Sequence, residues 1–114
     1  MESKEEVEIT EKDVIDMIDF FTRVPPLMLK MAIKSNMNVV KSFESQIKEH
    51  ESQLKEEERV KVEKVLEMPV FELQTILKKA YLKTGQKQLK ILADPKSEAF
   101  ISKNLKELKR VLFL

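Results

Sequence analysis

Few side chains in this sequence could carry chemistry, and the single histidine, His50, is the first of them. It stands between Glu49 and Glu51 on the most polar stretch of the chain. A di-iron site of the helical-bundle type needs a glutamate three residues before the histidine, but position 47 is isoleucine. The chain also lacks cysteine, so zinc sites built from cysteine and histidine and thiolate nucleophiles are excluded. We interpret His50 as a surface residue or the edge of a heptad.

Three aspartates, Asp13, Asp16 and Asp19, recur every third residue and could present carboxylates to a hard cation such as Mg²⁺. Positions three apart drift by about 60° around a helix across the set, so the row does not stay on one line. A solvated face near a helix N-terminus explains the row more simply. The serines lack a base held by a third group, as a hydrolytic triad requires. We therefore expect no metal, no cofactor and no enzymatic activity.

The one glycine, Gly85, limits what the backbone can do. The phosphate-binding loop, the dinucleotide fingerprint and the nucleophile elbow each need two or more glycines at fixed offsets. A chain this poor in glycine is typical of a protein made almost wholly of helices.

Length and composition indicate one domain. The chain has 114 residues, of which 42% are hydrophobic and 36% charged, and its 21 basic and 20 acidic side chains nearly cancel. We expect a lead-in over residues 1–9 and a single helical domain over residues 10–114. The absence of cysteine and of a secretory pattern favours the cytoplasm. The most apolar stretch, 24–33, is about half the length of a membrane span of roughly 20 residues.

Apolar spacing predicts the first helix over residues 10–24. Thr10 is its expected N-cap and Pro25 ends it. A long helix is expected to follow over 27–57, with a bend near 55–59. Along it large side chains recur every seven residues at Ile33, Val40, Ile47 and Leu54.

Four more segments complete the predicted bundle. A short helix is expected over 60–68, then a helix over 69–84 that ends at Gly85 in a left-handed conformation. Helices over 86–93 and from Asp94-Pro95 to the C-terminus follow. The core side of the 69–84 helix is predicted to consist of Phe71, Leu73, Ile76, Leu77, Ala80 and Tyr81. The sequence thus predicts an all-α, single-domain bundle of five or six helices with one long central helix.

Two apolar clusters exceed what a small bundle readily hides. One is methionine-rich and includes Leu27, Met28, Met31 and Met37; the other ends the chain with Val111, Leu112, Phe113 and Leu114. Flexible methionine side chains suit a groove for a partner helix, although they also serve as core filler. The terminal residues either tuck under the first helix or contact a partner. We expect a non-catalytic protein–protein interaction module, either an adaptor subunit of a larger assembly or a self-associating bundle.

Charge is divided between the two parts of the chain. Residues 1–67 contain 11 basic and 16 acidic side chains, a net charge of −5, and residues 68–114 contain 10 basic and 4 acidic, a net charge of +6. The alternative function is nucleic-acid binding, with phosphates neutralised around Gly85 by Lys78, Lys79, Lys83, Lys87 and Lys90. A simpler interpretation is that the two parts attract one another and that the lysines solvate outer faces.

Overall fold

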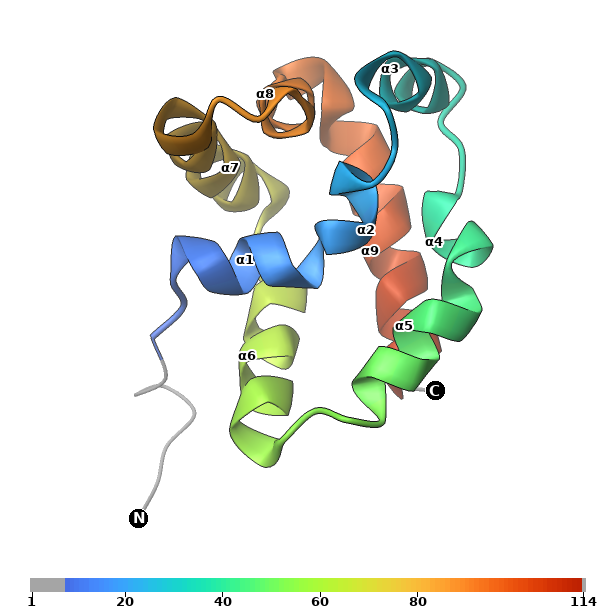
Figure 1. The fold of residues 1–114 in the computed structure, drawn as a ribbon, viewed down its shortest axis with the longest axis vertical. Coiled ribbons are helices and arrows are strands. Elements are labelled where there is room, and N and C mark those ends of the chain that lie inside the picture. Colours follow the sequence, from blue (N-terminus) through green and yellow to red (C-terminus); the bar gives the residue numbers. More distant parts are fainter. Residues whose placement is uncertain (1–7, 114) are drawn as a thin grey trace.

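The computed structural model describes residues 8–113, and every regular element among them is a helix (Figure 1). The all-α class predicted from the sequence is confirmed. Residues 1–7 of the predicted lead-in, and Leu114, lie outside the described residues, whereas Ile9 packs against the core. In chain order the helices are α1 (Glu11–Met17), α2 (Asp19–Thr22), α3 (Pro26–Lys34), α4 (Val39–Ser42), α5 (Glu44–Glu51), α6 (Glu56–Leu66), α7 (Val70–Thr84), α8 (Lys87–Ala93), the 3-10 helix η2 (Pro95–Ser97) and α9 (Glu98–Phe113).

The longest described helix is α9, and α4, α5, α6 and α7 pack directly against it (Figure 1). Its outer face carries charged side chains such as Lys106 and Lys109, which keep that side in water. The ring of Phe100 lies 5.4 Å from the ring of Phe21 in α2, measured between centroids. The buried apolar side chains of α9 are Phe100, Ile101, Leu105, Leu108 and Val111.

The predicted first helix begins as expected but is divided in two. Thr10 caps α1, because its hydroxyl accepts from the Asp13 backbone N–H while its own N–H donates to the Asp13 carboxylate at 2.9 Å. The helix breaks at Ile18, whose backbone leaves the α region. Phe20 and Phe21 follow this break as neighbours on the short helix α2, and both are buried in the core.

The long helix expected over 27–57 is not continuous, which corrects that prediction. The chain turns between α3 and α4, where Asn36 adopts a left-handed φ of 52°. It breaks again at Phe43 and at residues 52–55, slightly before the expected bend near 55–59. The division folds the seam back on the core, so that Val40 is fully buried and Ile47 packs against the core. The long helix at the centre of the fold is α9.

The second part of the chain follows the prediction closely. Gly85 ends α7 with φ 71°, and Asp94 caps the turn that leads into α9 by accepting from the Lys96 N–H at 2.9 Å. One residue of the predicted core side is wrong: Phe71 is 65% exposed. Leu73 and Leu77 define the inward face of α7. Phe71 precedes Leu73 by two residues, so its side chain starts about 200° around the helix from that face.

Candidate interaction surfaces

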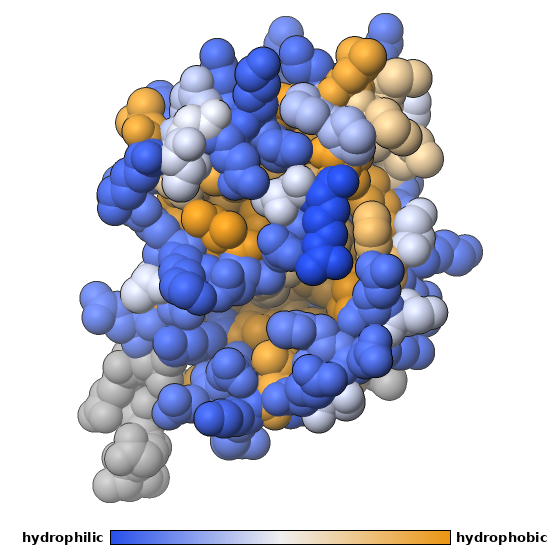
Figure 2. Space-filling model, viewed as in Figure 1, coloured by the Kyte–Doolittle hydropathy of each residue, from blue (hydrophilic) through white to orange (hydrophobic). Residues whose placement is uncertain are grey.

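An apolar patch covers the outer side of α3. We call Leu27, Met28, Met31 and Met37 the α3 patch; all four are exposed, from 53% for Met37 to 70% for Leu27. The opposite side of the same helix is buried through Leu29 and Ala32. Figure 2 shows apolar residues gathered over α3 at the upper right of this face. Since a nine-residue helix needs only one apolar side to join its own core, the outer side is surplus to folding.

The start of α3 is tied to α8. Pro25 and Pro26 form its first turn, and the Leu29 N–H donates to the Pro25 carbonyl at 2.9 Å. The Gln88 side chain donates to the carbonyls of Thr22 and Val24, at 3.2 and 3.0 Å, just before the helix begins. These hydrogen bonds fix the position of the residues that lead into α3 and its exposed patch.

The end of α3 is tied to α9 by a buried asparagine, Asn104. Its Oδ1 accepts from the backbone N–H groups of Val39 and Val40 at 2.7 and 3.2 Å, where α4 begins. Its Nδ2 donates to the carbonyls of Met37 and Phe100 at 3.0 and 2.8 Å. With four hydrogen bonds to the backbone, Asn104 is fully satisfied and holds the turn that carries Met37.

The C-terminal cluster belongs largely to the chain's own core. Val111 is 8% exposed, and Leu112 is partly buried against the core cluster. Phe113 is 36% exposed, and Leu114 lies outside the described residues. Helix α9 carries the tail away from α3 (Figure 1), and of the tail's described residues only Phe113 is exposed.

The five lysines of the nucleic-acid alternative lie on α7 and α8, and all are exposed. Lys83 forms an ion pair with Glu11 at 3.1 Å, and the Lys90 ammonium lies 5.7 Å from the centre of the Tyr81 ring. These contacts join basic side chains to their own chain, as the simpler interpretation expects. Lys78, Lys79 and Lys87 stand around them on the same two helices.

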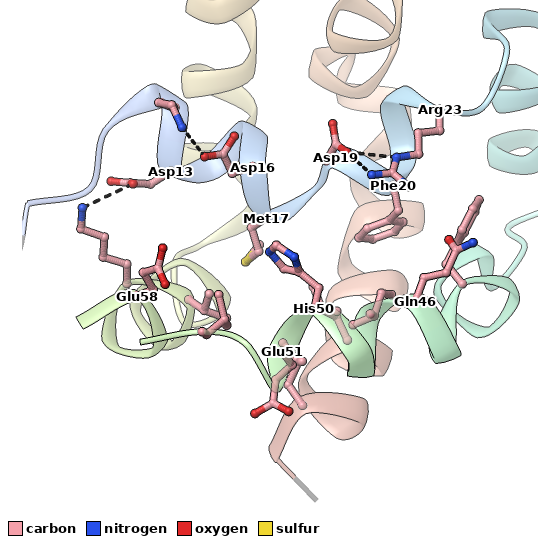
Figure 3. A pocket seen from close by; sticks show the side chains of 18 of the residues that line it. Asp13, Asp16, Met17, Asp19, Phe20, Arg23, Gln46, His50, Glu51 and Glu58 are labelled. Carbon is pink, nitrogen blue, oxygen red and sulfur yellow. Dashed lines mark hydrogen bonds and ion pairs between the residues drawn. The ribbon is translucent and has the colours of Figure 1, made fainter. Parts of the chain in front are cut away.

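A groove that sequence reasoning did not identify separates α1 and α2 from α5 and α6. Its volume is about 640 Å³, and Leu108 and Leu112 of α9 are among its lining residues. The close-up in Figure 3 shows His50 of α5 and Met17 of α1 pointing toward one another across it. The sequence analysis considered His50 and the aspartates at 13, 16 and 19 separately, because nothing in the sequence indicates that they lie along one groove.

Three ion pairs lie along the walls of this groove. Lys12 contacts Asp16 at 2.7 Å, Arg23 contacts Asp19 at 2.9 Å, and the Lys61 ammonium is 3.5 Å from the Asp13 carboxylate. The Asp16 carboxylate raises the pKa of Lys12, mainly through their hydrogen bond. Among the described residues, no group of three or more histidine, aspartate and glutamate side chains is placed to hold a metal ion.

The electrostatics of Asp13 show how the groove wall is built. Burial alone would raise the pKa of this carboxyl, but the hydrogen bonds from Thr10 and the charge of Lys61 outweigh burial and hold the pKa below its ordinary value. Asp13 thus links the capped start of α1 to the facing helix α6.

Comparison of the chain with protein-family models, with curated proteins and with solved structures found no match. Within residues 8–113, no helix combines the length and the apolar character that crossing a bilayer demands. What the molecule does must be inferred from its own surfaces.

Proposed function

We propose that this chain is a non-catalytic helical interaction module, an adaptor subunit or a self-associating bundle, and that the α3 patch is its principal contact. The observation that supports this is the two-sided apolar character of α3, which buries Leu29 and Ala32 while Leu27, Met28 and Met31 stand in water. A contiguous apolar patch on a small protein marks an interaction site far more often than scattered single residues do.

The geometry of α3 suits helix-to-helix recognition. Leu27 and Met31 are four residues apart and Met28 and Met31 three apart, so they share one side of the helix. Such i, i+3 and i+4 anchors are the pattern by which an amphipathic helix packs against a partner. Methionine adapts its shape at little cost, which favours contact with an apolar surface that is not perfectly complementary.

Sedimentation equilibrium over a wide range of protein concentration tests the self-associating form. We expect the mass of the unmodified chain to rise with concentration and the Leu27→Ser, Met31→Ser double variant to remain monomeric. Leu82→Ser is the matched control, because Leu82 is equally exposed on α7, and it should leave the mass curve unchanged.

The adaptor form predicts a partner protein at the same place. A photo-crosslinking residue at position 28 should join that partner in the cell, and a second crosslinker at exposed Leu82 should not. Leu27→Ser with Met31→Ser should abolish the crosslink. A chain that is monomeric at every concentration and gives the same crosslinks from positions 28 and 82 would refute the proposal.

Nucleic-acid binding through the basic part of the chain is the second candidate. It is supported by the exposure of all five lysines on two helices that pack together around Gly85. Binding to a DNA or RNA duplex should then fall steeply between 50 and 200 mM salt, by about tenfold or more if several phosphates are neutralised. Lys83→Glu with Lys87→Glu should abolish it, and the absence of binding at low salt would remove this candidate.

A further inference from the structure

The groove between α1–α2 and α5–α6 is a separate surface feature from the α3 patch. None of its lining residues belongs to α3. Its apolar part is drawn from four regions of the chain and includes Met17, Phe20, Ile47, Leu54, Val62 and Leu112. Figure 2 shows the surface hollowed in this region, with apolar residues visible between hydrophilic ones. An open hollow of about 640 Å³ can take several large side chains from another molecule.

The rim of the groove is acidic. Six carboxylates line it against three lysine and arginine side chains, Lys12, Arg23 and Lys61, and each of these three already pairs with an aspartate. Glu51 pairs with Arg59, and the Glu58 carboxylate accepts from the Lys55 N–H at 2.9 Å. Within the described residues Glu57 takes part in no ion pair. The surplus negative charge therefore lies on the α6 side and complements a cationic ligand.

We propose that this groove binds an amphipathic helical segment of a partner protein, with apolar side chains on one face and lysine or arginine along its border. Residues within 12–23 line one wall and residues within 43–62 line the facing wall, so each wall draws on several helical turns of the chain. A ligand helix of about three turns presents apolar anchors at i, i+3 or i+4, and i+7 to such walls. Basic residues beside the anchors meet the carboxylates of the rim. This contact fixes the orientation of the ligand helix and raises its association rate.

Fluorescence anisotropy with designed peptides tests the chemistry of the ligand. The probe is a labelled 14-residue helix with leucine on one face and lysine on the other, and two controls replace lysine by glutamate or scramble the leucine positions. We expect the lysine helix to bind the full chain and both controls to bind at least about tenfold more weakly.

Matched variants locate the binding site. Glu57→Lys should weaken the lysine helix by roughly three- to tenfold, a surface-charge effect, whereas Glu98→Lys should not change it. Both glutamates are exposed in the first turn of a helix, so the two changes perturb their helices alike. Leu54→Gln should also weaken binding, and Leu82→Gln on α7 should not.

The outcomes separate this site from the α3 patch. Binding that survives Leu27→Ser with Met31→Ser but is lost with Leu54→Gln supports the groove, whatever becomes of the proposed function. Equal binding of all three peptides, or equal effects of Glu57→Lys and Glu98→Lys, would overturn the proposal. A concentration-dependent dimer that Leu54→Gln dissolves would overturn it too, because the occupant would then be a second copy of the chain. Unchanged circular dichroism of each variant excludes unfolding as the cause.

Discussion

Helices α3 and α9 carry similar large apolar side chains and use them in opposite ways. Helix α9 directs its apolar residues to one side, where Phe100 and Leu108 are almost completely enclosed, and it keeps its charges outside. Helix α3 buries Leu29 and leaves Leu27 and Met31 in water on its other side. The core is thus closed without the outer side of α3, and this is the basis for the proposal that this side contacts another molecule.

The two helices are also linked by polar groups. Asn104 of α9 and Gln88 of α8 bind backbone atoms on either side of α3, so the exposed patch is held at both ends by the second part of the chain. A contact surface that is already ordered loses less conformational entropy on binding than a loose segment would. Helices α8 and α9 therefore support the two ends of α3, which carries the proposed contact surface.

The largest effect that tests this comparison is on the core side of α9. Phe100→Ala removes a fully buried ring that contacts Phe21, and we expect a loss of about 3–5 kcal/mol in the free energy of unfolding. Phe71→Ala makes the same chemical change at a 65% exposed position and should cost no more than about 0.5 kcal/mol. Urea unfolding followed by circular dichroism measures both, and similar losses would show that α9 is not the centre of the core.

The next effect concerns the link between the two helices. Asn104→Ala leaves the Val39 and Val40 N–H groups and the Met37 carbonyl without their buried partner, and we expect a loss of about 2–3 kcal/mol. Hydrogen exchange at Val39 and Val40 should accelerate more than exchange in α7. Unchanged protection at these two amides would mean that Asn104 does not hold the turn.

Asn104 also explains what the sequence could and could not predict. The α7–Gly85–α8 part was predictable because its signals are local: apolar spacing along α7, a glycine at the left-handed stop and an aspartate before a proline. The turn after α3 carries weaker local signals: Asn36 takes the left-handed conformation, and the Asn38 side chain caps α4 by accepting from the Lys41 N–H at 3.1 Å. The turn is also stabilised by Asn104, more than 60 residues further along the chain, which local signals do not reveal. Apolar periodicity alone therefore predicted an uninterrupted helix.

The two candidate surfaces also differ in how far their own sequence reveals them. The excess of apolar residues around Leu27, Met28 and Met31 is visible in the sequence, but the sequence left open whether they fill the core or meet a partner, and their exposure is a finding of the structure. The groove has no comparable sign in the sequence, because its walls come from α1 and α6, separated by more than 30 residues, and only the folded chain brings Asp13 to Lys61. A pairing of this kind depends on tertiary packing rather than on spacing.

A smaller effect compares how helices begin: α1 starts with the Thr10–Asp13 capping box, whereas α3 starts at proline with no side-chain cap. Because the folded pKa of Asp13 is below its ordinary value of 3.8, its stabilisation is fully present above that value. The stabilisation is lost as the pH falls through the folded pKa. Asp13→Asn should therefore cost about 0.5–1 kcal/mol at pH 7 and nothing once Asp13 is protonated.

Urea unfolding of both chains between pH 7 and pH 2.5 checks this dependence. Asp16→Asn is the control: Asp16 pairs with Lys12 at an exposed site and takes no part in the cap, so its substitution should have little effect at any pH. A gap between Asp13→Asn and the unmodified chain that stays constant at acid pH would mean that the charge of Asp13 contributes nothing to the cap.

The smallest effect on stability is expected on the outer side of α3, where the expected change in association is large. Hydrogen peroxide should convert Met28, Met31 and Met37 to sulfoxides before the half-buried Met17 and Met68, because reaction requires access to the thioether. Peptide mass spectrometry gives the order of oxidation, and circular dichroism should show helicity unchanged while the three exposed sites react.

A polar sulfoxide on the α3 patch should abolish association there, since it replaces an apolar contact by one that retains water. If helicity fell with the first oxidation at Met28 or Met31, these side chains would be supporting the chain's own fold, and the contrast between α3 and α9 would fail.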